Sequence, residues 1–236
     1  MSKFSNKYKS YILFERVLFD GVEEYWRKRD AEGYDSRVNT SGRMKAYQWM
    51  ADQAKSHLTK EGVVSMDLGC GTGIFAEAVG VKNIIGVDIS PTMLVIARTR
   101  MERVYEGDIF DLRLGQDSVD NVITLFVLAD YPSEKKMDFL QQVYSCLKQG
   151  GRFFFSAYSP NDGYMGKSAR ERASMRKGGG SFELYLENAS TYKDMLENIG
   201  FRIDKIETLE STGTLKSGSE TISFDREFIV IVALKE

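Results

Sequence analysis

Short β-rich apolar runs alternate with helical patterns from residue 63 onward, and this alternation constrains the fold of the chain most strongly. It is typical of strand–helix–strand units, in which helices cover a sheet of parallel strands. We therefore predict an α/β fold with a seven-stranded, mostly parallel sheet flanked by helices. The predicted strands are residues 63–66, 83–87, 103–105, 119–128, 152–157, 201–208 and 227–234.

Glycine, proline and small polar residues mark the ends of the intervening helices. A short helix from Ile74 to Val79 precedes Gly80, and Ser90 with Pro91 starts the next one. Further helices should begin at a Ser133 cap and stop at 150–151, and run over 191–199. Residues 1–60 are helical in pattern and 158–189 form a polar insertion after the fifth strand, so we expect a helical lid (1–60) and a main domain (61–236) carrying a substrate cap.

Composition excludes several classes of protein. The net charge of −2 provides no global positive field for nucleic acid or an anionic membrane surface. Cys70 and Cys146 are too few for a disulfide framework, and neither has metal-ligand spacing. The first 20 residues lack an apolar signal segment, and no run is long enough to cross a bilayer. We expect a cytoplasmic protein without a metal, a membrane or a nucleic-acid partner.

The segment Asp67-Leu68-Gly69-Cys70-Gly71-Thr72-Gly73 joins the first predicted strand to the first helix. Glycines there allow a tight turn and a close approach of a ligand to the main chain, at the sheet edge where open α/β folds bind ligands. A glycine turn alone is weak evidence, because many tight turns need glycine for steric reasons.

Two further acids strengthen this prediction. Asp88 ends the second strand, where a carboxylate can accept hydrogen bonds from both hydroxyls of a ribose. Asp108 follows the third strand and is placed to accept from the exocyclic amine of an adenine. Three successive strands thus carry an acid at the same edge, a pattern that a solvated turn does not explain.

Over about residues 60–157 the chain resembles the class I S-adenosylmethionine-dependent methyltransferases, particularly the small-molecule group with ubiquinone and menaquinone methyltransferase relatives. The resemblance implies a Rossmann-like fold, with S-adenosylmethionine as cofactor and S-adenosylhomocysteine as product. By that resemblance the glycine loop contacts the methionine part, Asp88 the ribose, and Asp108 with Ile109 the adenine. The implied cofactor-binding residues are Tyr34, Asp67, Gly69, Cys70, Gly71, Gly73, Asp88, Ile89, Asp108, Ile109 and Leu125.

The chain departs from the family pattern in places. Gln149 replaces the usual proline of the turn before the fifth strand, and Ile74 breaks the glycine spacing of dinucleotide enzymes, which leaves a nicotinamide dehydrogenase a distant alternative. The fourth strand has neither the motif of amino-methylating nucleic-acid enzymes nor the histidine that many small-molecule relatives carry after it. Asp130 and Tyr131 are therefore the local candidates for a general base, with helix-flanking or packing roles as the alternative.

Several side chains outside the sheet could complete a substrate site. Tyr25, Trp26, Tyr34 and Tyr47 could cover a sulfonium, although Trp26 and Tyr47 also suit helical core packing. His57, the sole histidine, is expected to be a solvated residue near a helix C-terminus, where the helix dipole favours a cation. The basic residues of the insertion either bind an acidic group of the substrate or form a solvated helix face. They are Lys167, Arg170, Arg172, Arg176 and Lys177.

Three functions stay open. The leading one is methylation of an O, N or C atom of a small molecule by in-line displacement, by a monomer or a homodimer. The second is methylation of protein or RNA, for which a large basic or extended docking surface is expected. The third is a protein that binds the cofactor without transferring the methyl group, which residues alone do not exclude.

Overall fold

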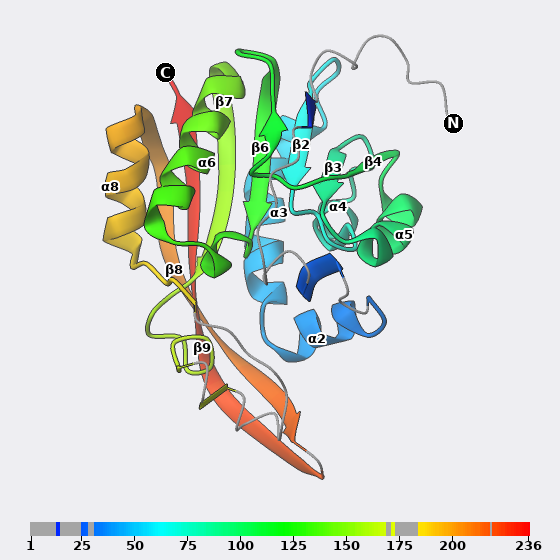
Figure 1. Ribbon diagram of the computed structural model, residues 1–236, viewed down its shortest axis with the longest axis vertical. Helices are drawn as coiled ribbons and strands as arrows, with labels where there is room; N and C mark the ends of the chain where they lie inside the picture. The colour runs from blue at the N-terminus through cyan, green and yellow to red at the C-terminus, as the bar shows by residue number, and fades with distance from the viewer. Residues whose placement is uncertain (1–12, 15–24, 28–30, 169–170, 173–183, 218) are drawn as a thin grey trace.

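A computed structural model describes residues 13–14, 25–27, 31–168, 171–172, 184–217 and 219–236 (Figure 1). Its centre is a seven-stranded sheet in the order β4-β3-β2-β6-β7-β9-β8, in which β9 is antiparallel to both neighbours and the other neighbouring pairs are parallel. The expected mostly parallel, Rossmann-like sheet is confirmed. The strands are β2 (Ser65–Leu68), β3 (Ile85–Asp88), β4 (Arg103–Glu106), β6 (Val119–Leu125), β7 (Leu147–Tyr158), β8 (Phe201–Ser217) and β9 (Glu220–Lys235).

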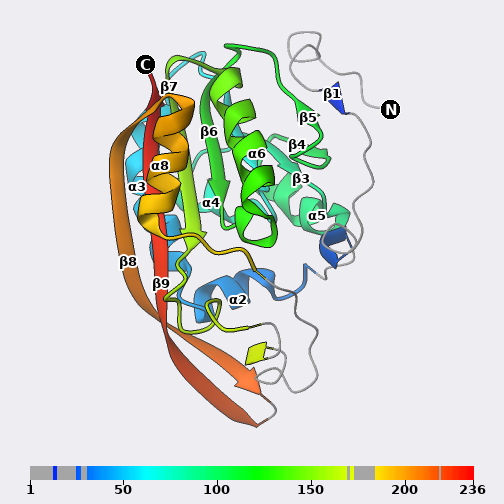
Figure 2. The same ribbon diagram turned by 60° about the vertical axis from the view of Figure 1, so that its left-hand side comes forward.

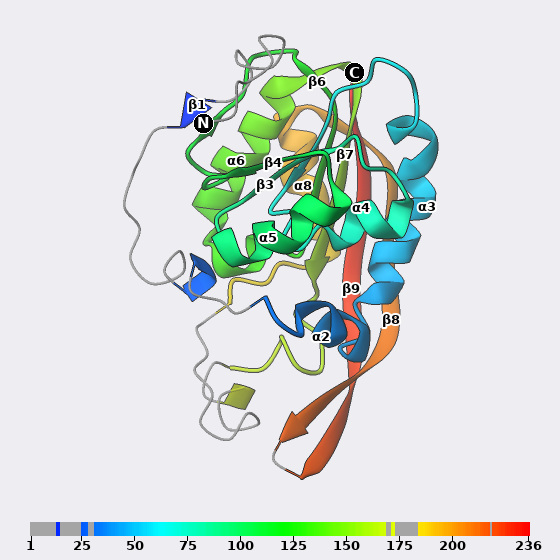
Figure 3. The same ribbon diagram turned by 90° about the vertical axis from the view of Figure 1, so that its right-hand side faces the viewer.

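Helices cover both faces of this sheet (Figures 1 and 2). The first face carries α3 (Met44–Leu58), α4 (Ile74–Val79) and α5 (Pro91–Arg100), and the second carries α6 (Ser133–Cys146) and α8 (Ala189–Ile199). A short helix, α2 (Tyr34–Thr40), lies beyond the carboxyl ends of the parallel strands, as Figure 3 shows. No helix among the described residues is both long and apolar enough to span a lipid bilayer.

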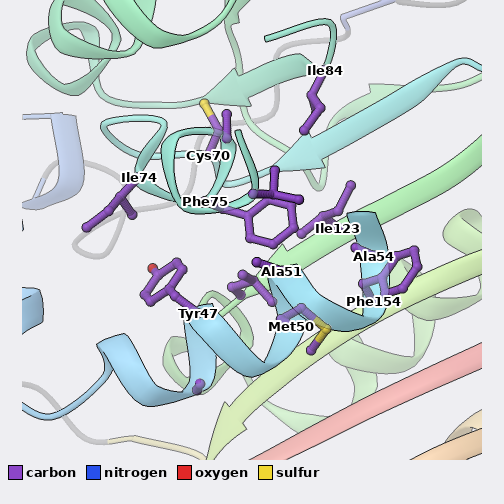
Figure 4. Packing of buried hydrophobic residues seen from close by; sticks show 14 of the residues in the cluster. Tyr47, Met50, Ala51, Ala54, Cys70, Ile74, Phe75, Ile84, Ile123 and Phe154 are labelled. Atoms are coloured by element: carbon purple, nitrogen blue, oxygen red, sulfur yellow. The ribbon is translucent and has the colours of Figure 1, made fainter. Parts of the chain in front are cut away.

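The apolar face of α3 anchors the N-terminal segment to the sheet. Tyr47, Met50, Ala51 and Ala54 lie in one cluster with Phe75 of α4 and with strand residues such as Ile123 and Phe154 (Figure 4). Each of these side chains is at least 94% buried, because the apolar residues recur at helical spacing and face one way. This packing holds the turn before α3 beside the edge of the sheet.

Local sequence explains how the helices around the ligand-binding edge begin and end. The Ser90 hydroxyl accepts a hydrogen bond from the Met93 N–H at 3.5 Å, and Pro91 occupies the first turn, as predicted. Gly80 ends α4 with φ 71°, and Gly200 ends α8 with φ 116°, conformations that side chains other than glycine rarely adopt. Both predicted helix ends are confirmed.

Strands β8 and β9 are much longer than predicted. Pairing of β9 with β7 stops at Tyr158↔Phe228, but pairing with β8 continues to Ser217↔Glu220. Residues 210–217 and 220–227 therefore form a two-stranded hairpin arm beyond the sheet (Figure 1). The sequence prediction missed the arm because the polar segment 210–217 lacks the apolar alternation of a half-buried strand.

Four boundaries correct the sequence analysis. Residues 13–14, expected to be helical, form strand β1 (Leu13–Phe14), because their backbone pairs with β5 (Leu112–Arg113). Strand β6 stops at Leu125 because Phe126 has φ 61°, and a 3-10 turn follows at Leu128–Asp130. Helix α6 ends at Cys146, since Leu147 is extended and begins β7. Ser133 is not its cap; Pro132 takes that position, and the Ser133 hydroxyl donates to Glu187 at 2.7 Å.

Candidate functional site

The glycine loop follows β2 and turns sharply into α4. Gly69 has φ 81°, and a Cβ built there would lie 2.4 Å from Val127 Cγ2, so the approach of the loop to the end of β6 requires glycine. Gly71 has φ 53° and donates its backbone N–H to Asp88 Oδ2 at 2.7 Å. The loop is thus held against the neighbouring strand end by a carboxylate.

Asp88 is fixed at the end of β3 by backbone donors. Besides the bond from Gly71, its Oδ1 accepts from the Ser90 N–H at 2.9 Å. Burial raises the pKa of Asp88, and the N–H donors of Ser90, Gly71 and Ile89 oppose that rise. A carboxylate can accept about four hydrogen bonds, so Asp88 retains capacity to accept from a ribose hydroxyl after these three N–H donors.

Asp108 lies beside Asp88 at the next strand end. The Gly107 N–H donates to the Asp88 carbonyl at 3.0 Å, and Asp108 Oδ1 accepts from the Phe110 N–H at 2.9 Å. These bonds orient the segment after β4 toward the same edge as the glycine loop.

Two cavities occupy this edge. The first, about 80 Å³, is bordered by the glycine loop and the ends of β3, β4 and β6. The second, about 570 Å³, lies between α2, the insertion and the hairpin arm, and shares Trp26, Tyr34 and Asp130 with the first. The first cavity is lined by Trp26, Tyr34, Gly69, Gly71, Asp88, Ile89, Met93, Gly107, Asp108, Ile109, Leu125, Phe126, Val127, Asp130 and Tyr131.

Asp67 adds a buried acid behind the loop. It is 2% exposed and forms no salt bridge with any described residue. Burial, followed by the charge of Asp88, raises the pKa of Asp67 to about 8. A cationic ligand near this acid pair would favour its charged form, so the residues present fit a ligand that combines an adenosine with a positively charged tail.

The comparisons with known proteins agree with this geometry. Residues 66–155 match the family model described as methyltransferase domain. A solved S-adenosylmethionine-dependent methyltransferase from Thermotoga maritima has 24% identity and a TM-score of 0.60, over 90% of this chain and 98% of that one. Residues 66–155 are thus similar to a methyltransferase domain, and the chain shares its fold with this S-adenosylmethionine-dependent methyltransferase.

Curated relatives of this methyltransferase domain act on different acceptors. A cypemycin N-terminal methyltransferase from a Streptomyces species is 35% identical over 44% of this chain and 46% of its own. An 18S rRNA (guanine(1575)-N(7))-methyltransferase from Saccharomyces cerevisiae is 29% identical, over 41% of each chain. An erythromycin 3''-O-methyltransferase from Saccharopolyspora erythraea is 30% identical over 68% of this chain and 58% of its own. The matched part spans about half the length of the first three curated relatives.

The structure brings most predicted cofactor residues of the methyltransferase domain together. Of the 11 residues that the resemblance implies, those that line the first cavity are Tyr34, Gly69, Gly71, Asp88, Ile89, Asp108, Ile109 and Leu125. The other three lie behind it. Asp67 is buried under the loop, the Cys70 side chain packs in the hydrophobic core, and Gly73 caps α4.

The base candidates Asp130 and Tyr131 also lie on the wall of the first cavity of the methyltransferase domain. Trp26 Nε1 donates to Asp130 Oδ2 at 2.9 Å. Burial raises the pKa of Asp130, while the Trp26 bond and the charge of Arg172 lower it. Tyr131 packs on Phe110 with ring centroids 4.1 Å apart, so a packing role is evident for Tyr131.

The aromatic residues expected to form a lid divide into two groups. Tyr25, Trp26 and Tyr34 line the second cavity, whereas Tyr47 is 5% exposed and packs on Phe126 with centroids 5.7 Å apart. Core packing is therefore the role of Tyr47, and the lid alternative for that residue is wrong.

The basic residues of the insertion are only partly described. Arg172 lines the second cavity, is 3% exposed, and donates to the carbonyls of Met165 and Lys167, so a solvated helix face is wrong for this side chain. Arg170, Arg176 and Lys177 lie outside the described residues.

His57 lines neither cavity. It is half-buried near the end of α3, with its ring 6.2 Å from that of Phe154. Burial, then the charges of Arg152 and Lys60, lowers its pKa, which opposes the cationic form expected at a helix end. Within the described part of the chain, no cluster of three or more His, Cys, Asp or Glu residues could hold a metal.

Sequence reasoning missed the wall formed by the hairpin arm. Thr214, Leu215, Thr221, Phe224 and Arg226 of that arm line the second cavity. The polar segment 210–217 gives no apolar alternation that would have predicted this part of the strand. Arg43, at the turn before α3, was also missed, because a lone arginine before a helix has no specific sequence signature.

Proposed function

We propose that this protein transfers the methyl group of S-adenosylmethionine to an O, N or C atom of a small molecule held in the second cavity. The observation that carries the proposal is that the two cavities adjoin. Both are lined by Trp26, Tyr34 and Asp130. An acceptor in the second cavity and a cofactor in the first would meet at these side chains. The described residues of 1–60 and 158–189 would then serve as lid and cap.

The cofactor would be held by groups whose positions are already fixed. Asp88 would accept hydrogen bonds from the ribose hydroxyls through the lone pairs that its backbone donors leave. Asp108 and Ile109 would flank the adenine, and the Gly69–Gly71 backbone would face the methionine part. S-adenosylmethionine, when bound, supplies a methyl group that its positive sulfur already activates.

Asp130 is the side chain best placed to accept a proton from the acceptor. Tyr34 and Trp26 would restrict the orientation of the acceptor. Such alignment can supply much of the acceleration of an in-line displacement.

The shape of the second cavity favours a small acceptor. A volume of about 570 Å³ lies within the range of ordinary small-molecule sites. The overall charge of −2 gives no general attraction for a nucleic-acid backbone. Because relatives include rRNA and peptide methyltransferases as well as an O-methyltransferase, RNA and peptide acceptors belong in the test.

The test has two steps. Calorimetry first measures binding of S-adenosylmethionine and S-adenosylhomocysteine, for which we expect micromolar dissociation constants. Formation of S-adenosylhomocysteine is then measured with small phenols, amines and acids, with ribosomal RNA, and with peptides. Turnover of a small molecule supports the proposal. Turnover of RNA or peptide alone refutes it, and cofactor binding with no product from any acceptor identifies a binding protein.

Asp130→Asn tests the role of the base. With an acceptor that must lose a proton, we expect kcat to fall by about 100-fold or more, while S-adenosylhomocysteine affinity changes little. Asp138→Asn, an exposed acid on α6, is the matched control and should leave both quantities unchanged. An unchanged kcat in Asp130→Asn would remove Asp130 from the mechanism.

A further inference from the structure

Arg43 projects into the second cavity from the turn that joins α2 to α3. Its Nε donates to Ser41 Oγ at 3.0 Å, and its Nη1 lies 3.3 Å from the Tyr158 hydroxyl and 3.5 Å from the Tyr34 hydroxyl. All three partners are neutral oxygens. The guanidinium has five N–H donors, and its Nη2 makes no hydrogen bond with the described residues.

This cation also lacks a counter-charge. No carboxylate of the described residues lies within 4.0 Å of Arg43. The neighbouring phenol does not supply one, because burial raises the pKa of Tyr158. A half-buried cation without a carboxylate is unfavourable unless something else compensates it.

The remaining wall of the second cavity adds positive charge. Its described lining contains five cationic side chains, those of Arg37, Arg43, Arg172, Lys216 and Arg226, and a single acidic one, Asp130. Arg226 has its own carboxylate, since Nε lies 2.7 Å from Asp162 Oδ2 and both side chains are at most 3% exposed. Arg226 is thus compensated, whereas Arg43 has no carboxylate of the described residues within 4.0 Å, and an anionic ligand would balance its charge.

The same wall presents aromatic faces. Phe224 of the hairpin arm stacks on Tyr164 with centroids 5.2 Å apart and an interplanar angle of 23°. Tyr34 lies under the Arg43 guanidinium at 5.5 Å, and Tyr158 lies under that of Arg226 at 5.6 Å. Planar rings beside guanidinium groups suit a planar acceptor with an acidic substituent.

We propose that the methyl acceptor is an aromatic carboxylic acid, or a similarly planar anion, whose acidic group pairs with Arg43. This inference rests on the proposed function, because it assigns the second cavity to the acceptor. The carboxylate of the cofactor has the same chemistry and is the competing partner of Arg43. Arg43 lines the second cavity and not the first, which favours the acceptor.

Matched acid and amide probes test the proposal. Protein saturated with S-adenosylhomocysteine is titrated calorimetrically with 1-naphthoate and with the neutral 1-naphthamide. We expect the acid to bind at least about tenfold more tightly, since a hydrogen bond to a charged group contributes about 1.5–3 kcal/mol. Arg43→Gln should bring the two affinities within about twofold. Lys55→Gln, which removes an exposed cation from α3, the helix that follows Arg43, should keep the preference for the acid.

A second ligand pair separates the two partners of Arg43. S-adenosylhomocysteine carries the amino-acid carboxylate, and 5'-methylthioadenosine lacks it. If Arg43→Gln weakens the binding of S-adenosylhomocysteine but not that of 5'-methylthioadenosine, and leaves the preference for the acid unchanged, Arg43 binds the cofactor carboxylate and the proposal is wrong. Equal binding of 1-naphthoate and 1-naphthamide to the unmodified protein, or binding of neither, also overturns it. If Arg43→Gln does not fold, Arg43→Lys must keep part of the preference. A confirmed preference without turnover of any acceptor refutes the proposed function and leaves the anion site intact.

Discussion

Gly69→Ala tests whether the glycine loop is fixed by its contact with the end of β6. A residue other than glycine at φ 81° costs about 1–2 kcal/mol. The new Cβ would also lie 2.4 Å from Val127 Cγ2, whereas two carbons in contact normally lie about 3.5–4.0 Å apart. Such overpacking costs about 1–3 kcal/mol, so the total loss should be about 2–5 kcal/mol.

Val127→Ala separates these two costs. It removes both methyl groups, and the nearest remaining atom, Val127 Cβ, lies 3.4 Å from the new Cβ. In the double variant the steric part should disappear while the backbone part remains. We expect a coupling free energy of about 1–3 kcal/mol in favour of the double variant.

Chemical denaturation of the four proteins of this cycle measures the effect, with thermal melts as a second readout. At about 2–4 °C per kcal/mol for a chain of this size, Gly69→Ala should lower Tm by roughly 4–20 °C. A coupling below about 0.5 kcal/mol would refute the steric argument, because the glycine would then be required only for its backbone conformation.

Three further predictions concern buried acids. Asp88→Ala should weaken S-adenosylhomocysteine binding by about 100-fold or more in calorimetry, since about two charge-assisted hydrogen bonds are lost, and a change below threefold would contradict the ribose assignment. Because burial raises the pKa of Asp67 to about 8 in the folded protein, folding takes up a proton between about pH 4 and pH 8. The unfolding free energy of the unliganded protein should therefore fall as pH rises through this range, and Asp67→Asn should reduce the slope of that fall. Asp162→Asn leaves Arg226 buried without its carboxylate and should cost about 3–5 kcal/mol in urea unfolding, whereas the exposed control Asp138→Asn should stay within about 0.5 kcal/mol.

The grouping of residues around the first cavity was largely predictable because its signals are local. Glycines with positive φ and acids at successive strand ends stand at fixed places in the sequence, and parallel strands bring those ends together. Gly69, Asp88 and Asp108 were found in this way. The left-handed conformation of Phe126, which ends β6 early, carries no such signal, because phenylalanine rarely adopts it.

The second cavity was not predictable because it depends on distant pairings. Arg226 reaches Asp162 and the Ser41 carbonyl, which are 64 and 185 residues away in sequence. Neither contact follows from periodicity or spacing. The arm that carries Arg226 was itself missed, since its strand pairing is stabilised by few apolar side chains.

The hairpin arm has a consequence for protein engineering. The first cavity is bordered mainly by parallel strand ends, whereas much of the second is bordered by an extension of the two antiparallel strands at one side of the sheet. Residues 210–227 could therefore be exchanged for hairpins of other lengths and sequences while the register of β2, β3 and β6 stays unchanged. A library of such grafts, retaining Arg226 opposite Asp162, would vary the wall of the second cavity and leave the first unchanged; under the proposed function, this changes the acceptor and keeps the methyl donor.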